Sequence, residues 1–334
     1  MRHRTPYFRP YNRNMRHKAG RCARWIWSAV CLSAYLTLWY PAWAQAGPKP
    51  ASDLQQAVVR AMAGRNGAAV VLDVASGKVL TAYHPQTAAR RLALPGSSIK
   101  PFTLLALLES GKVNAQTTML CKRPLTIGGH RLDCTHPDVQ QPFDPATALA
   151  YSCNSYFTSV ALRLTSAELR NAFFRFGFAA ASGLAPNEAT GRVELAGSQV
   201  QLQLEAIGEW GVHVTPLELL RGYQNLALLS QEHDTRLAPL FAGMEASASY
   251  GMARMAQPDA AMKIAGKTGT SRADEGTWRH GWFAGYAPAE KPEIALVVFL
   301  ERGNGPTDAA TIARAIFEAY ASVRKSRASQ GREQ

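Results

Sequence analysis

Features that mark several other classes of protein are scarce or absent in this chain of 334 residues. It has no internal repeat, no low-complexity stretch and no long linker. Its one conspicuous apolar run, Trp25 to Tyr40, is shorter than the roughly 20 residues that a membrane-spanning helix needs. Only five cysteines are present, and three of them follow residue 46. The length beyond that residue is enough for one large domain or two closely packed lobes.

Acidic residues are missing from the first 24 residues, which hold eight Lys or Arg. The apolar run follows this basic flank, Pro41 breaks it, and Ala44-Gln45-Ala46 offers a small-x-small cleavage pattern. Residues 1–46 are therefore predicted to be a signal peptide for export, to the periplasm or the outer face of the cytoplasmic membrane. The alternative is an uncleaved anchor that keeps the N-terminus associated with the membrane.

The formal net charge of +13 does not indicate binding to nucleic acid, because the basic residues gather at the two ends. Eight lie in the first 24 residues, and four follow Val323. The core from 47 to 322 carries about +2 and is predicted to be one domain. Residues 323–334 are predicted to be a basic, disordered tail. Nothing in the sequence predicts an oligomeric state.

Ser97 and Lys100 form a Ser-x-x-Lys pair directly after Pro95-Gly96. Residues three apart share one face of a helix, so the lysine can reach the serine hydroxyl. Serine is a weak nucleophile until a base takes its proton, and a neutral lysine can be that base. The pair alone is weak evidence, since chance yields roughly one such spacing in a few hundred residues. The simpler interpretation is a capped surface helix.

Two further motifs follow in order. Ser152-Cys153-Asn154 would by itself be a helix cap or a turn, and Lys267-Thr268-Gly269-Thr270 would be an exposed strand end. Gly269 has no side chain to block a ligand that approaches the strand. The joint occurrence of the three motifs favours one shared site over three unrelated features.

Ser-x-x-Lys, Ser-x-Asn and Lys-Thr-Gly in this order resemble the penicillin-binding proteins and the serine β-lactamases. The resemblance covers about residues 55–322. Val70 to Tyr83 is similar to the opening hairpin of that family, and Gly281 to Pro288 to its strand after Lys-Thr-Gly. Ala206 to Glu218 is similar to a segment of the transpeptidases, in which glutamine is more usual at the position of Glu209.

The resemblance implies acyl transfer on the D-Ala-D-Ala end of peptidoglycan stem peptides, with no metal and no other cofactor. Ser97 would attack the penultimate carbonyl, and Lys100 would take its proton. Burial and the nearby charge of Lys267 would lower the pKa of Lys100 enough for it to be a base. A β-lactam, as a mimic of the dipeptide, would acylate Ser97.

The same resemblance implies roles for the other two motifs. Ser152 would relay a proton to the leaving amine, while Asn154 would hold Lys100 and the substrate amide. Lys267 and the hydroxyls of Thr268 and Thr270, around Gly269, would bind the terminal carboxylate. Backbone N–H groups of Ser97 and Thr270 would form the oxyanion hole.

The pattern of elements predicts an α+β fold, in which an antiparallel sheet is flanked by helices and joined to an all-helical lobe. Strands are expected at 68–83, 261–270, 280–287 and 292–300. Helices are expected at 97–110, 144–164, 166–175, 215–229 and 308–320. The implied architecture places the site where the sheet and the lobe meet.

Cys121 and Cys134 flank Leu125 to Leu132, which reads as two short strands around a Gly-Gly turn. Because an exported protein meets an oxidising compartment, the two cysteines are predicted to form a disulfide. Cys153 is expected to point away from its motif as a small buried hydrophobe. The rival interpretation is a zinc site with the ligands Cys121, His130, Cys134 and His136. The spacing of these residues along the sequence matches none of the common zinc patterns.

Two other functions are compatible with the same motifs. A β-lactamase needs a group that activates water, and Glu188 is the candidate after the second motif; class D enzymes favour an apolar residue where this chain has Asn154. A sensor or scaffold would bind β-lactams or wall peptide without turnover. Hydrolysis of nitrocefin distinguishes the lactamase, and turnover of a D-Ala-D-Ala peptide excludes the sensor. The motifs do not separate cross-linking from removal of the terminal D-Ala.

Overall fold

The structure is a computed structural model that describes residues 50–258 and 262–330. The predicted signal peptide, residues 1–46, lies outside this part of the chain. Among the helices that are described, none has the length and the apolar character needed to cross a membrane.

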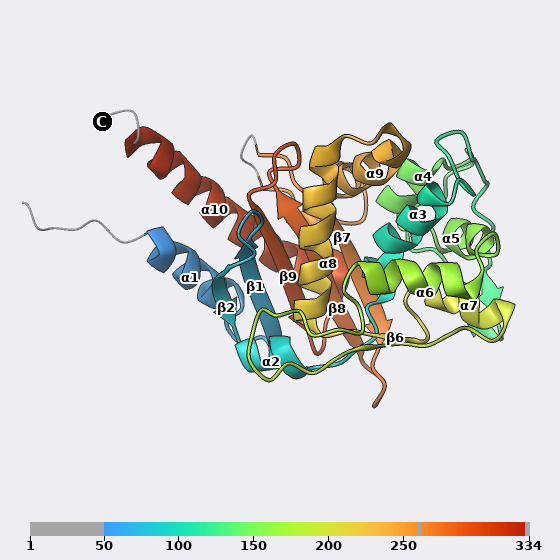
Figure 1. Cartoon of the computed structure of the whole chain (residues 1–334), viewed down its shortest axis with the longest axis horizontal. Helices are drawn as coiled ribbons and strands as arrows, with labels where there is room; N and C mark the ends of the chain where they lie inside the picture. The colour runs from blue at the N-terminus through green and yellow to red at the C-terminus, as the bar shows by residue number, and fades with distance from the viewer. Residues whose placement is uncertain (1–49, 259–261, 331–334) are drawn as a thin grey trace, which may run out of the picture. The chain divides into compact units, whose positions relative to one another are not determined.

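A five-stranded sheet forms the centre of the fold (Figure 1). Its strand order is β2-β1-β9-β8-β7, and every neighbouring pair is antiparallel. β7 is an edge strand, so the Lys267–Thr270 motif lies at a margin of the sheet. The strands are β1 (Gly67–Asp73), β2 (Val79–Tyr83), β7 (Ala265–Arg272), β8 (Arg279–Ala287) and β9 (Ile294–Leu300).

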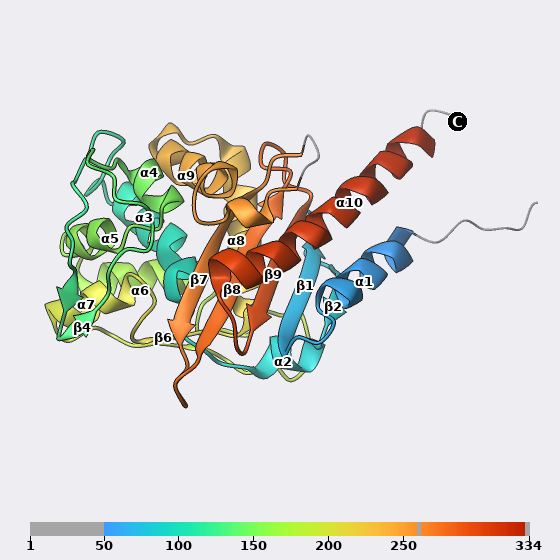
Figure 2. The same ribbon diagram turned by 180° about the vertical axis from the view of Figure 1, so that it is seen from behind.

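Helices cover both faces of this sheet. α8 (Pro216–Leu229) crosses one face (Figure 1), while α1 (Pro50–Ala61) and α10 (Ala310–Gln330) lie side by side on the other (Figure 2). Successive side chains of a strand point to opposite faces. In β1, Val70 therefore packs in the apolar cluster under α8, and Val71 packs in the cluster under α10.

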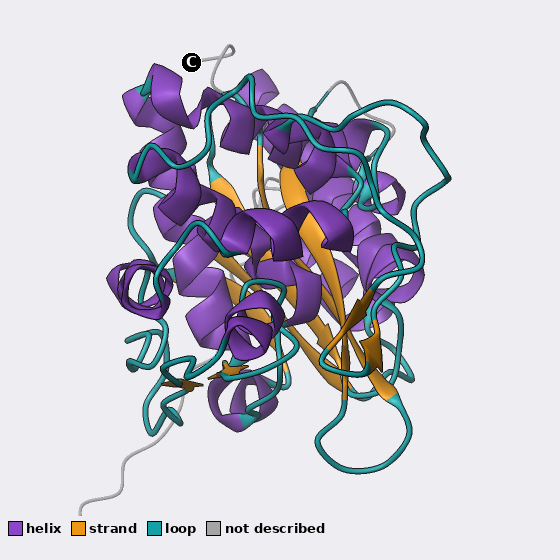
Figure 3. Cartoon of the chain, turned by 90° about the vertical axis from the view of Figure 1, so that its right-hand side faces the viewer, coloured by secondary structure: helices purple, strands orange, loops and turns teal. Residues whose placement is uncertain are grey.

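A helical lobe stands beside β7, and its helices lie in front of the strands when it is viewed from its outer side (Figure 3). α3 runs through the lobe and is buried from Lys100 to Leu108. The lobe contains α3 (Lys100–Glu109), α4 (Pro145–Ala150), α5 (Asn154–Ala161), α6 (Ser166–Arg175), α7 (Gln199–Glu205) and α9 (Ala238–Ser249). The smaller elements are α2 (Pro85–Arg90), β3 (Thr126–Ile127), β4 (His130–Arg131), β5 (Arg192–Val193) and β6 (Val212–His213).

The predicted α+β architecture is confirmed, with two local corrections. The helix predicted at 144–164 is two helices, because Ser152 has a left-handed backbone (φ 57°) that ends the first before α5 begins. The predicted disordered tail is also wrong over most of its length, since α10 continues to Gln330. Val323 is buried and Arg324 forms an ion pair with Glu293, which holds the extra turns against the body of the protein.

Candidate active site

Ser97 lies in a 3₁₀ turn, Gly96–Ile99, that leads directly into α3. Two glycines let this turn approach β7 at the backbone level. A Cβ on Gly269 would lie 2.4 Å from the Pro95 carbonyl oxygen, and one on Gly96 would lie 2.7 Å from the Thr270 oxygen. Gly96 also has a left-handed backbone (φ 53°), which glycine adopts at little cost. The first and third motifs are therefore in direct contact.

Lys100 connects the first motif to the second. Its side chain is fully buried, and its Nζ donates to Asn154 Oδ1 at 2.6 Å. The same Nζ donates to the Ser152 carbonyl at 2.7 Å and lies 3.2 Å from Ser152 Oγ. Asn154 in turn donates to the Leu132 carbonyl, which fixes the orientation of its amide. The role predicted for Asn154, holding Lys100, agrees with this geometry.

Lys267 completes the group from the third motif. Its Nζ is buried, donates to Ser152 Oγ at 2.8 Å and also donates to the Thr268 carbonyl. The Ser152 hydroxyl thus lies between two lysine side-chain nitrogens, on a residue with left-handed backbone. Such a conformation is costly for a residue other than glycine and is typical of functional sites.

Burial sets the ionisation of the two lysines. It lowers the pKa of Lys100 to about 8, against the opposing effect of the Cys134 and Cys153 thiols and of Glu209. Burial also lowers the pKa of Lys267 well below its usual range, and repulsion from Lys100 adds to this. Of the two causes expected from the sequence, burial and the charge of Lys267, burial is the main cause of the lowered pKa of Lys100. One of the pair can therefore be neutral near neutral pH.

Ser97 and Ser152 share a cavity of about 730 Å³ that also exposes Asn154, Thr268, Gly269 and Thr270. Ser97 is half-buried, and among the described residues its hydroxyl forms no hydrogen bond. Hydrogen bonds of catalytic groups are often loose before a substrate binds. The three motifs thus meet at one cavity, as the sequence predicted.

The third motif is held more tightly than the sequence suggested. Thr270 Oγ1 accepts from the Gly305 backbone N–H at 3.0 Å, and Thr268 is almost fully buried. The buried Lys267 donates a hydrogen bond to Ser152. Of the three residues predicted to bind a carboxylate, the half-buried Thr270 is therefore the most accessible to a ligand.

Three arginines line the cavity and were not predicted as site residues: Arg131, Arg272 and Arg279. Glu209 lies among them, and burial raises its pKa while Arg272 and Arg279 oppose the shift. The signal available in the sequence was the position of Arg272 and Arg279 just after the third motif. Their charges make the cavity attractive to an anionic ligand.

Glu188, the candidate for activating water, does not line this cavity. Its carboxylate accepts from the backbone N–H groups of Ser182, Leu184 and Ala185. Although burial opposes the effect, these hydrogen bonds lower the pKa of Glu188. It is a structural residue of its loop, which removes the sequence feature that favoured a β-lactamase.

The predicted disulfide is absent from the structure. Cys121 Sγ and Cys134 Sγ lie 3.5 Å apart, whereas bonded sulfurs lie about 2.05 Å apart. The predicted hairpin between them is confirmed as β3 and β4, with Gly128 and Gly129 in left-handed conformations at its turn. Cys153 is buried and faces Cys134, at 3.8 Å between their sulfurs.

Comparison with protein families finds one model that matches residues 67–319, the penicillin binding protein transpeptidase domain. The peptidoglycan D,D-transpeptidase FtsI of Escherichia coli is 27% identical over 280 residues, which cover 70% of this chain and 47% of that protein. MrdA of Acinetobacter baumannii, another peptidoglycan D,D-transpeptidase, is 22% identical over 364 residues. This aligned region covers 81% of this chain and 53% of MrdA. This chain spans about half the length of these relatives.

Solved structures share the fold. The PBP2 crystal structure from Pseudomonas aeruginosa has a TM-score of 0.71 and 23% identity, over 80% of this chain and 77% of that one. The PBP2 of a complex with MreC from Helicobacter pylori gives a TM-score of 0.72 and 20% identity, over 81% of this chain and 62% of that one. At such identities the likeness concerns the fold and not the chemistry.

Proposed function

This chain belongs to the penicillin-binding protein transpeptidase family, and from that premise we propose that it is a serine acyltransferase acting on D-Ala-D-Ala stem peptides of peptidoglycan. The observation that carries the proposal is the convergence of Lys100 and Lys267 on Ser152, with Lys100 also bonded to Asn154, at the cavity that Ser152 and Asn154 share with Ser97. Three motifs far apart in sequence supply these groups, so their meeting is specific.

The first half-reaction forms an acyl-enzyme. The Ser97 oxygen attacks the penultimate carbonyl, and its proton passes to the neutral amine of Lys100. The Ser97 and Thr270 backbone N–H groups stabilise the oxyanion, because their segments are in direct contact. Ser152 receives hydrogen bonds from two lysines, which leaves its own O–H free to donate to the leaving amine of the terminal D-Ala.

The substrate's terminal carboxylate, which belongs to the leaving D-Ala, would bind beside Thr270. The Thr270 hydroxyl would donate to it, while Arg272 and Arg279 supply positive charge across the cavity. This revises the role expected for Lys267, which acts on Ser152 and reaches the carboxylate only through the local field. An acceptor amine completes a cross-link, and water completes a carboxypeptidase reaction.

The wider organisation is proposed from the sequence. Residues 1–46 export the chain to the periplasm or the outer face of the cytoplasmic membrane, and residues 47–322 form the catalytic domain. The partners of that domain would be stem peptides and β-lactams.

The test is intact mass spectrometry after incubation with penicillin, together with turnover of a D-Ala-D-Ala peptide. A stable adduct of one penicillin, located on Ser97, and release of D-Ala would support the proposal. Rapid hydrolysis of nitrocefin with no stable adduct would instead identify a β-lactamase. A stable adduct with no peptide turnover would identify a sensor.

A further inference from the structure

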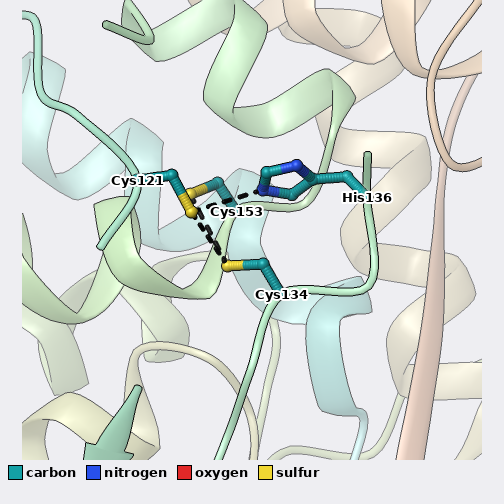
Figure 4. A group of neighbouring side chains, drawn as sticks. All are labelled: Cys121, Cys134, His136 and Cys153. Atoms are coloured by element: carbon teal, nitrogen blue, oxygen red, sulfur yellow. Dashed lines mark hydrogen bonds between the residues drawn. The ribbon is translucent and has the colours of Figure 1, made fainter. Parts of the chain in front are cut away.

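Four side chains, one of them from the second motif, point toward one another (Figure 4). Cys121 precedes β3, Cys134 and His136 follow β4, and Cys153 lies in the turn that leads into α5. Their sulfur and imidazole nitrogen atoms all lie within 4.8 Å of one another. Cys134, His136 and Cys153 are buried, and Cys121 is half-buried.

Three of the six separations among these atoms match the edges of a tetrahedron around one zinc ion, and all six lie within 4.8 Å. With Zn–S near 2.3 Å and Zn–N near 2.0–2.1 Å, tetrahedral ligand atoms lie about 3.5–3.8 Å apart. Cys121 Sγ lies 3.5 Å from Cys134 Sγ and 3.6 Å from His136 Nε2, and Cys134 Sγ lies 3.8 Å from Cys153 Sγ. A disulfide would bring one pair to about 2.05 Å and leave the other two groups without a partner.

The surroundings suit three thiolates and a neutral imidazole. His136 Nδ1 lies 2.7 Å from the Pro137 carbonyl; in the tautomer that donates this hydrogen bond, the Nε2 lone pair faces Cys121. The Asn154 N–H donates to Cys134 Sγ at 3.2 Å, and the Tyr156 N–H donates to Cys153 Sγ at 3.4 Å. Backbone N–H groups at a helix N-terminus stabilise thiolates.

A positive charge completes this environment. Arg123 Nη2 donates to the His136 carbonyl at 2.7 Å, and it lies 2.8 Å from Nδ1 and 3.3 Å from Nε2 of the same imidazole. Because a guanidinium only donates, it keeps its bond to the carbonyl and shifts away from the ring in the tautomer whose Nδ1–H donates to Pro137. Three thiolates and one divalent ion carry a net negative charge, which the guanidinium offsets at close range.

We propose that Cys121, Cys134, His136 and Cys153 bind one Zn²⁺ ion in a structural site. Four protein ligands leave no open position, so the ion is not a catalyst. The ligand set differs from the zinc site considered from the sequence, since His130 is exposed on β4 and Cys153 takes its place. Cys153 was not expected to be a ligand, because it stands between Ser152 and Asn154, the two residues for which that motif was considered.

The site has a consequence for the second motif. Cys153 stands between Ser152 and Asn154, and both of these hold Lys100. The ion would tie this turn to the 121–136 segment, which also supplies Arg131 to the cavity wall. Zinc would therefore position Ser152 and Asn154 without contacting substrate. Metal binding is independent of the proposed function, whereas this positioning role rests on it.

Metal content tests the site by itself. The full-length protein, purified without chelators, should contain about one zinc per chain by inductively coupled plasma mass spectrometry. Replacement by Co²⁺ should give the thiolate-to-cobalt charge-transfer bands of a tetrahedral site. A metal-free protein whose unreduced mass is lower by a pair of hydrogen atoms, with Cys121 joined to Cys134, would overturn the proposal.

Variants at the half-buried ligand separate metal binding from folding. Cys121→Ser should lose most of the bound metal, while Cys121→His, which offers a Cys₂His₂ set, should retain it. Lys122→Ala, an exposed neighbour in the same segment, is the matched control and should keep a full complement of zinc. Equal zinc in Cys121→Ser, Cys121→His and the control would show that the cluster is not the site.

Acylation by penicillin tests the positioning role. Removal of zinc by a chelator should slow acylation by about ten- to a hundredfold, because catalytic groups displaced on the order of 1 Å lose about that much rate. Adding Zn²⁺ back should restore it. Stoichiometric zinc whose removal leaves the acylation rate unchanged would overturn the positioning role, and absence of acylation in the zinc-loaded protein would count against the proposed function alone.

Discussion

The ammonium group of Lys267 lies 2.8 Å from the hydroxyl oxygen of Ser152, which Lys100 approaches from the first motif at 3.2 Å. Two cations on one hydroxyl are tolerable only if one of them gives up its proton, because both are buried. Burial lowers the pKa of each lysine, which agrees with this requirement. The contact therefore accounts for a neutral base in a site that also attracts an anionic substrate.

Replacement of the proposed nucleophile should remove labelling and leave the fold unchanged. Ser97→Ala is expected to show no covalent adduct with a fluorescent penicillin, with a melting temperature close to that of the parent. Ser98→Ala is the adjacent control: its hydroxyl donates to the Pro95 carbonyl and is not at the cavity. It should still be labelled, even if less stable. Labelling of the Ser97 variant on another residue would refute the assignment.

Acylation should rise with pH and level off near the pKa of about 8 that burial gives Lys100. Lysine accepts the serine proton only when neutral, so below that value the rate constant should increase by about tenfold per pH unit. Lys100→Arg should lose acylation as fully as Lys100→Ala, since arginine stays charged at these pH values. Stopped-flow acylation from pH 5.5 to 9.5 measures this. A flat profile, or an active Arg variant, would mean that Lys100 acts only through its charge.

Gly269→Ala should impair catalysis through the backbone. The added Cβ would lie 2.4 Å from the Pro95 carbonyl and 2.9 Å from the Ser98 nitrogen, which forces β7 away from the turn that carries Ser97. Because a displacement on the order of 1 Å can slow a reaction by about a hundredfold, an acylation loss of about that factor is expected. Gly197→Ala is the matched control, because its Cβ would have only an ordinary 3.4 Å contact. Similar rates in both variants would show that the close approach is unnecessary.

The sequence predicted the meeting of the three motifs better than it predicted their surroundings. Order and spacing singled out Ser97, Ser152 and Lys267, because the proposed chemistry constrains those residue types directly, and the structure brings their motifs together. Helix α9 was not predicted, since Ala238–Ser249 is apolar without a clear amphipathic period and is buried among other helices. The cluster of Cys153 with His136 depends on how a loop folds back on a turn, and no local pattern encodes that meeting.

Glu205 should make the protein less stable at alkaline pH. Its carboxylate is fully buried, neither oxygen has a partner among the described residues, and burial raises its pKa to about 8. The unfolded chain ionises near the ordinary value, so stability from this group is complete below about pH 4.3 and is lost as pH rises toward 8.

Glu205→Gln removes that ionisation. Its free energy of unfolding should exceed that of the parent by on the order of a few kcal/mol at pH 9 and differ little at pH 4.5. Urea unfolding at both values measures the difference. Glu232→Gln, at an exposed site, should follow the parent at both. A parent and Glu205 variant with parallel pH profiles would show that Glu205 does not ionise within this range.

Thr270 is expected to recognise the terminal carboxylate. Its hydroxyl borders the cavity near Arg272 and accepts from the Gly305 N–H, so its own proton is free for a ligand. A charge-assisted hydrogen bond is worth about 1.5–3 kcal/mol. Thr270→Val should therefore slow acylation by about ten- to a hundredfold, at 1.4 kcal/mol per decade.

Part of that loss could come from the Gly305 N–H, which valine leaves without an acceptor. An analogue with a neutral amide in place of the carboxylate separates the two effects, because the structural cost applies to both ligands and the charge-assisted contact to one. Thr270→Val should lose much more rate with the acid than with the amide, while Thr270→Ser, which keeps the hydroxyl, should lose little with either. Equal losses for the acid and the amide would mean that Thr270 only supports Gly305, and that recognition of the carboxylate belongs to the arginines of the cavity.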